Sequence, residues 1–341
     1  MIPAEQCFDA RQSISMSGYS RRDHAGGDWI ALVTFASSVL RLTPGMMLFF
    51  SFVVPGAAAE NPSLASQKAT APKHDSVGNW RVDYHRARSA AIDAKKNLLI
   101  HFVGIRQTAR HRRFVTNTCY RSDMRPLLEN FVCVRLPHDY TVPADGQKRV
   151  LLQLPGFEVM QRQGGLAMID FSHPDSMAYG QVIGGLPFIK PIYYATPFES
   201  PFSVSTFLGL PSGTLAERMM VYAIRMHPEG PQSTSGVSSP VLSKAASTHS
   251  RQQALLGRQG HHQWQSRFQD LWEQIGGKPP VEVCAESWPD EPLLTACLGC
   301  VHAWRQSAGH WQSVSGKHPL YAYSIYRGHN RIWYATGIFG G

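Results

Sequence analysis

Residues 82–102 read VDYHRARSAAIDAKKNLLIHF and join a helical pattern directly to a strand pattern. The first part carries aromatic and small residues three or four positions apart, which is the spacing of one helix face: Tyr84, Ala87, Ala91 and Ala94. The apolar run at residues 98–102 predicts a short buried strand, and residues 131–136 and 166–171 predict two more. Because helix and strand signals alternate, this part of the chain is predicted to form an α/β layer.

The composition is that of a globular protein. The chain has 341 residues, 43% of them hydrophobic and 17% charged, which excludes a disordered tail or a fibrous repeat. Its length predicts two domains, each large enough to bury a core. The net charge of +9 is moderate, and its densest part is a group of six arginines. These are Arg106, Arg110, Arg112, Arg113, Arg121 and Arg125.

This arginine group predicts a solvated basic surface, with anion binding as an alternative. Nucleic acid is not an expected partner, because neither an aromatic platform nor a recognition helix accompanies the charge.

The first 59 residues are interpreted as a leader that contains a signal peptide. Its apolar region covers about residues 47–59, where an apolar run is followed by Pro55-Gly56 and three alanines. We therefore expect cleavage near Ala59-Glu60, a secreted or periplasmic protein, and no membrane span in the mature chain. The alternative is an uncleaved N-terminal anchor that includes the earlier apolar stretch at residues 29–40. Residues 60–77 are interpreted as a flexible linker.

Residues 78–188 resemble a thioredoxin-like domain. The resemblance rests on the pattern W-x-x-D-Y-x-x-A from Trp80 and on KNLLIHF at residues 96–102. Redox members of such a family need a Cys-x-x-Cys soon after that strand, and here no cysteine appears before Cys119. Gly164-Gly165 stands where the family has its cis-proline. The resemblance therefore implies a redox-inactive scaffold, and the proline-rich residues 189–215 are interpreted as an interdomain connector.

The remainder, residues 216–341, is predicted to be an α-β-α sandwich. Ser239 and Pro240 are typical of a helix start, and Gly257 is typical of its end. A second helix is predicted up to Gly276-Gly277 and a third over residues 291–307. Two strands at residues 320–326 and 332–339 are predicted to form a terminal hairpin.

Five segments of this part resemble the CAP superfamily of cysteine-rich secretory, antigen 5 and pathogenesis-related proteins, in its bacterial SCP-like form. They follow one another in the family's order over about residues 219–341. They are PVLSKAASTHS at 240–250, GHHQWQSRF at 260–268, CAES at 284–287, WRQSAGHW at 304–311 and WYATGIFG at 333–340.

The resemblance implies a cavity lined by His261, Glu286 and His310. Two imidazoles and a carboxylate can hold a zinc ion, with His261 and His310 as the metal ligands. The same residues can instead form a hydrogen-bonded polar cluster in which Glu286 fixes the tautomers of both rings. His249 lies on the apolar stripe of its helix and is expected in the core.

The cysteines allow two interpretations. Cys297 and Cys300 form a Cys-x-x-Cys pair within a predicted helix, which is a redox motif in some proteins. The preferred pairing is a structural disulfide between Cys284 and Cys300, because it would tie the segment of Glu286 to the third helix.

These features predict an exported, non-catalytic binding protein. Its ligand is expected in the cavity of the C-terminal part, with an extracytoplasmic or cell-envelope protein as an alternative partner. Two enzyme alternatives remain. The first is a zinc-dependent hydrolase with Glu286 as general base, and the second is a thiol oxidoreductase that uses Cys297 and Cys300.

Overall fold

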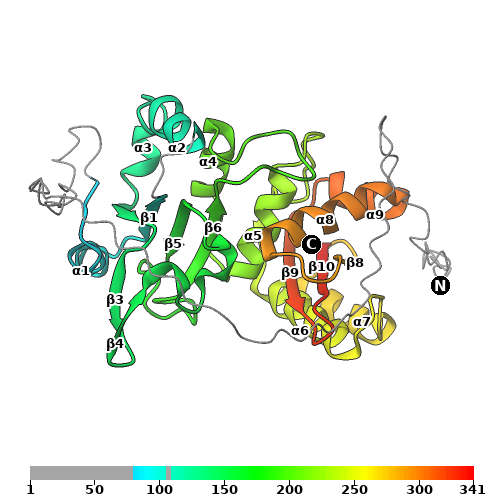
Figure 1. Cartoon of the computed structure of the whole chain (residues 1–341). Helices are drawn as coiled ribbons and strands as arrows, with labels where there is room; N and C mark the ends of the chain where they lie inside the picture. Colours follow the sequence, from blue (N-terminus) through cyan, green and yellow to red (C-terminus); the bar gives the residue numbers. More distant parts are fainter. Residues whose placement is uncertain (1–79, 105–108) are drawn as a thin grey trace, which may run out of the picture. The chain divides into compact units, whose positions relative to one another are not determined.

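The computed structural model describes residues 80–104 and 109–341 (Figure 1). The predicted leader, its cleavage site, the linker and Arg106 lie outside the described residues. In the described part no helix is both long enough and apolar enough to cross a membrane.

The first half is built around helix α1 (Tyr84–Ala94) and strand β1 (Leu98–Val103), as predicted. The Asp83 side chain caps α1 by accepting a hydrogen bond of 2.9 Å from the backbone N–H of Arg86. Lys95, at φ 49°, ends the helix in the left-handed conformation. Strand β1 then enters the core, where residues 98–102 are all buried.

The first sheet has the strand order β2-β1-β5-β6. Strand β2 (Val132–Pro137) runs parallel to β1, and β5 (Gly165–Ile169) runs antiparallel to it. Strand β6 (Val182–Pro187) pairs antiparallel with β5. Besides β2, the elements between β1 and β5 are α2 (Ala109–Arg113), the π-helix η1 (Phe114–Cys119), α3 (Arg125–Leu128), β3 (Thr141–Ala144), β4 (Gln147–Val150), η2 (Leu151–Gln153) and η3 (Phe157–Met160).

Residues 189–215, interpreted from the sequence as an interdomain connector, contain a helix. Residues Pro201–Leu208 form helix α4, because Ser200 caps the helix and Pro201 occupies its first turn. Helix α5 (Leu215–Arg225) follows, with a capping box between Thr214 and Glu217. The buried side of α5 packs against β6 of the first sheet and against the second sheet.

The second sheet has the order β7-β9-β10-β8. Its strands are β7 (Val237–Ser238), β8 (Val281–Glu286), β9 (Leu320–Arg327) and β10 (Trp333–Gly340). The predicted terminal hairpin is confirmed, because β9 and β10 pair antiparallel. The accompanying helices are α6 (Pro240–Leu256), α7 (Trp264–Ile275), α8 (Leu293–Gln306) and α9 (Ala308–Ser315). The predicted start of α6 at Ser239 and its end at Gly257 are also confirmed.

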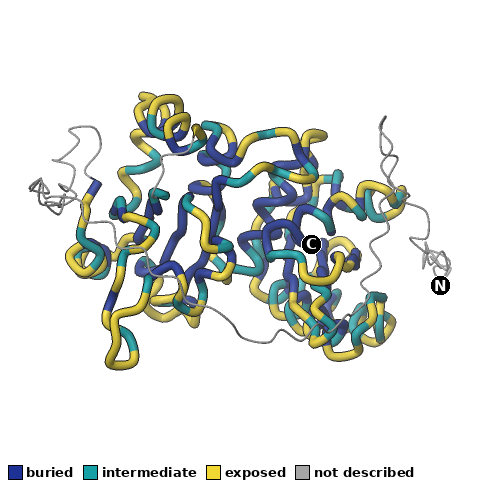
Figure 2. Tube along the Cα trace, viewed as in Figure 1, coloured by how far each residue is buried: buried dark blue, intermediate teal, exposed yellow. Residues whose placement is uncertain are grey.

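Both faces of the second sheet are covered by helices. Residues of α6 and α7 form a small apolar cluster with Ala322 and Ile338. Residues of α5 and α8 form a larger cluster with Val283, Ala285 and Phe339, and this cluster is continuous with the core of the first sheet. Figure 2 shows the buried residues along both sheets. The predicted α/β class is therefore confirmed.

Candidate functional site

A buried carboxylate organises the α6 side of the second sheet. Because side chains alternate along a strand, Glu282, Cys284 and Glu286 of β8 belong to one face, opposite Val283 and Ala285. The side chain of Glu282 is 0% exposed. A charge at such a site needs close partners, since burial without them would cost several kcal/mol.

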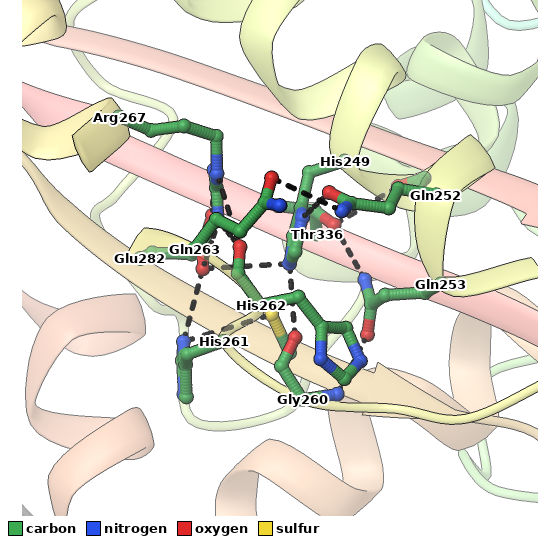
Figure 3. Close-up of polar contacts among 12 residues, drawn as sticks. His249, Gln252, Gln253, Gly260, His261, His262, Gln263, Arg267, Glu282 and Thr336 are labelled. Carbon is green, nitrogen blue, oxygen red and sulfur yellow. Dashed lines mark hydrogen bonds and ion pairs between the residues drawn. The ribbon is translucent and has the colours of Figure 1, made fainter. Parts of the chain in front are cut away.

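Three cationic or imidazole groups surround this carboxylate (Figure 3). The Arg267 guanidinium donates to both oxygens, at 2.7 Å and 3.1 Å. His261 Nδ1 lies 3.0 Å from Oε1, and His249 Nε2 lies 3.5 Å from the same atom. Burial alone would raise the pKa of Glu282, but the hydrogen bonds from His261 and Arg267 lower it below its usual value. Glu282 is therefore a carboxylate at neutral pH.

His249 is a fully buried residue of α6, as the sequence predicts. Its Nε2–H donates to the Gly260 carbonyl at 2.9 Å, and its Nδ1 lies 3.3 Å from Gln252 Oε1. Burial lowers the pKa of this imidazole, which keeps it neutral. Next to it, Gln253 and Thr336 hydrogen-bond each other across α6 and β10 (Figure 3). His249 therefore belongs to a buried polar layer of the core.

Two of the three predicted cavity residues lie together. His261, in the loop before α7, has its ring centroid 5.9 Å from that of His310 on α9. The side chain of His261 is 36% exposed, so it is accessible from solvent. Burial, assisted by the neighbouring His261, lowers the pKa of His310 to about 4. His310 is consequently a neutral imidazole at physiological pH.

The third predicted residue, Glu286, has a different position. It lies exposed at the end of β8, where partial desolvation raises the pKa of its carboxyl. Within residues 80–104 and 109–341 it forms no hydrogen bond or ion pair with His261 or His310. The carboxylate that holds His261 is that of Glu282, four residues earlier on the same face of β8. The sequence signal for Glu282 was its place in the alternation Val-Glu-Val-Cys-Ala-Glu, with its side chain on the same face as Cys284 and Glu286.

The five described cysteines are all free, so the predicted Cys284–Cys300 disulfide is not formed. Cys284 lies on the α6 face of β8, with its Sγ 3.8 Å from His261 Nδ1. Cys300, on α8, belongs to the large core cluster that includes Val283 and Ala285 of the opposite face. The sheet itself therefore separates the two thiols. Burial also raises the pKa of Cys297 and Cys300, so both remain protonated thiols at neutral pH.

A reducing agent should consequently have no effect on stability. We expect the thermal midpoint to be the same with and without dithiothreitol, and the five described thiols to react with Ellman's reagent in unfolded, unreduced protein. A structural disulfide would instead make reduction cost about 2–4 kcal/mol of unfolding free energy. A clear drop in the midpoint on reduction would contradict the free state of these cysteines.

The predicted basic surface contains its own acidic partner. Glu199 is 2% exposed and accepts hydrogen bonds from Arg113 at 3.1 Å and 2.5 Å, while Arg110 lies 3.9 Å away. Thr118 of the π-helix donates to the Glu199 backbone carbonyl. Part of the positive charge of this surface is thus neutralised, and these contacts connect α2 and η1 to the segment that leads into α4.

Two groups of side chains near Glu282 have donor atoms for a metal ion. The ligand atoms of His249, Glu282 and Cys284 lie within 4.8 Å of one another. These donors already have other partners, however. Arg267 donates a hydrogen bond to Glu282, and His249 donates one to the Gly260 carbonyl. Burial raises the pKa of the Cys284 thiol well above its usual value, so the thiol stays protonated. These three residues are therefore a poor metal site at neutral pH.

The pair of His261 and His310 offers two imidazoles as metal ligands. A carboxylate only accepts hydrogen bonds, so His261 carries its proton on Nδ1 and its lone pair on Nε2. Metal-binding histidines characteristically have one ring nitrogen held in this way by a carboxylate. When bound, zinc would supply a Lewis-acidic centre with open positions for a ligand.

Family models, curated proteins and solved structures were all compared with this chain, and none of them matches it.

Proposed function

We propose that the chain is an exported binding protein whose His261–His310 pair holds a divalent transition-metal ion, with zinc as the best fit to the donors. The observation that best supports this proposal is the 3.0 Å contact between His261 Nδ1 and Oε1 of the buried Glu282. It fixes the ring and its tautomer beside a second neutral imidazole. The bound ion then offers open coordination positions to a small ligand or to a side chain of an envelope partner.

The architecture supports two finer assignments within this proposal. In the first sheet, β1 is parallel to β2 and antiparallel to β5, which agrees with a thioredoxin-like unit. Helices on both faces of the second sheet agree with a CAP-type sandwich. The leader outside the described residues is the basis for export.

Binding without turnover is favoured over hydrolysis by the environment of Glu282. A general base needs a free lone pair near the attacking water. The oxygens of Glu282 already accept from Arg267 and His261, and the lowered pKa makes this carboxylate a weak base. The alternative base, Glu286, hydrogen-bonds neither ring among the described residues. The role that fits Glu282 is to orient His261.

Zinc titration by calorimetry tests this function. We expect one site in the full chain, weakened at least tenfold by either His261→Ala or His310→Ala, since each removes a ligand. His262→Ala is the matched control, because His262 is adjacent in sequence but its Nε2 is bonded to the Arg258 carbonyl at 3.1 Å. Unchanged zinc affinity in the double variant of His261 and His310 would refute the assignment.

A further inference from the structure

A second group of polar residues lies away from the histidine pair, where the end of β5 meets the loop before α5. Asp170 directly follows β5, and its side chain is 4% exposed. Its Oδ1 accepts hydrogen bonds from the backbone N–H groups of Ser172 at 3.0 Å and His173 at 3.3 Å. Ser172 Oγ also contacts it, at 3.1 Å. These bonds fix the position of the carboxylate.

His173 connects this carboxylate to a serine from a distant part of the chain. Its Nδ1 lies 3.1 Å and 3.2 Å from the two oxygens of Asp170. Its Nε2 lies 2.9 Å from Ser212 Oγ. Since Asp170 only accepts, Nδ1 carries the proton, and the Nε2 lone pair is left to accept the Ser212 hydroxyl proton. Ser172 Oγ, 2.9 Å from Nδ1, is a second neighbour on the Asp170 side.

The three residues thus have the contacts of a catalytic triad: carboxylate to Nδ1, and Nε2 to a serine hydroxyl. Such arrangements are recognised by geometry and not by sequence position. Ser212 is exposed and His173 is 43% exposed, so a substrate has access to both. Asp170, the orienting group, is the buried member.

The backbone before Ser212 is anchored by hydrogen bonds from Arg218. Buried Arg218 donates to the carbonyls of Leu210 and Pro211, which anchors the loop. The eleven-residue helix α5 begins directly after this loop, with Thr214 as its cap. In the first turn of α5 the Glu217 amide already donates to the Thr214 hydroxyl, which leaves the amides of Leu215 and Ala216 without intrahelical acceptors at the positive end of the helix dipole. The Glu217 carboxylate is occupied by the N–H and hydroxyl of Thr214.

We propose that Ser212, His173 and Asp170 form a hydrolytic site for esters of short carboxylic acids. The hollow of about 10 Å³ beside Ser212, lined also by Glu217, Arg218 and Tyr323, has room for about one water molecule, so the acyl group of a small ester lies on the exposed side of Ser212. The amides of Leu215 and Ala216 at the start of α5 supply hydrogen bonds for the oxyanion. This activity is independent of the proposed metal site.

The reaction follows from the contacts. Ser212 Oγ attacks the ester carbonyl carbon and forms a C–O bond, while its proton passes to His173 Nε2. Asp170 stabilises the resulting imidazolium. Collapse of the tetrahedral intermediate breaks the bond to the leaving alcohol, which takes the proton from Nε2. Water then attacks the acyl-serine, again giving a proton to His173, and the carboxylic acid leaves as Ser212 Oγ recovers that proton.

A fluorophosphonate probe and p-nitrophenyl acetate test the proposal with the full chain. We expect one covalent adduct, located on Ser212 by peptide mass spectrometry, and ester hydrolysis above the buffer rate. Ser212→Ala should abolish both, and His173→Ala should lower both at least 100-fold. Ser235→Ala is the control for an exposed serine outside the site and should react as the parent does. The activity should persist in a chelator, which separates it from any metal-dependent hydrolysis.

The alternative is a purely structural role, in which these three residues only link two loops. It predicts that Ser212→Ala lowers the thermal midpoint while the parent protein takes no label. Folded parent protein, checked by circular dichroism, that remains unlabelled on Ser212 would overturn the proposal, as would ester hydrolysis that survives in Ser212→Ala.

Discussion

Glu282→Ala should lower the free energy of unfolding by about 3–5 kcal/mol, because it removes one partner of a buried charged network. The variant leaves the Arg267 guanidinium, 20% exposed, without its two carboxylate bonds and leaves His261 without its acceptor. Urea unfolding at neutral pH, followed by circular dichroism, measures the loss.

The matched control is Glu273→Ala on the neighbouring helix α7. Glu273 is exposed and accepts a single side-chain bond of 3.1 Å from Gln269, so its removal should change stability by less than about 0.5 kcal/mol. If Glu282→Ala is as stable as this control to within about 1 kcal/mol, Glu282 is not the organising charge of the site.

His101→Leu should stabilise the protein by about 1–3 kcal/mol at neutral pH, because it removes a buried polar group that lacks partners. His101 is 0% exposed, and neither ring nitrogen has a hydrogen-bond partner among the described residues. The ring is enclosed by Trp80, Phe114 and Phe188, and it stacks on His111. Leucine has a similar volume and offers only apolar atoms.

This difference should grow in acid. Burial, with smaller contributions from Arg135 and His111, holds the pKa of His101 well below 6.5. Between that low value and 6.5 the unfolded chain takes up a proton that the folded protein does not, so stability falls as pH falls. The parent should therefore lose about 1.4 kcal/mol of unfolding free energy per pH unit below 6.5 through His101, and His101→Leu should not show this part of the loss. Exposed His329→Leu is the control, and an equal pH dependence of parent and His101→Leu would contradict this account.

Local sequence signals predicted the regular elements well. The cap at Ser239 and the glycine at Gly257 define α6, and the alternating residues of the C-terminal hairpin define β9 and β10, because these signals act within a few residues. Helix α4 was missed because eight residues are too few to show a clear period among prolines. Its cap and first-turn proline were nevertheless present in the sequence.

The site was predictable only in part, since it depends on which face each strand residue occupies. His261 and His310 were found through a resemblance, and the structure brings them together. The same resemblance selected Glu286, whereas Glu282, on the same face of β8, reaches His261. The Cys284–Cys300 pairing failed for a related reason, since sequence spacing does not show that a sheet separates two thiols.

Contacts between distant loops left no sequence signal at all. Ser212 meets His173 across 39 residues, through two loops that only the packing of α5 against β6 brings together. No spacing rule connects such residues, and only Asp170 and His173, three apart, are local.

The most direct test of the central claim is a crystal structure of the full chain in zinc, with anomalous differences recorded at the zinc edge. The account predicts one peak at about 2.0–2.1 Å from a ring nitrogen of each of His261 and His310. The Glu282 carboxylate should remain on His261 Nδ1. A peak held by Cys297 and Cys300, or zinc-bound crystals with no peak at the two rings, would contradict it.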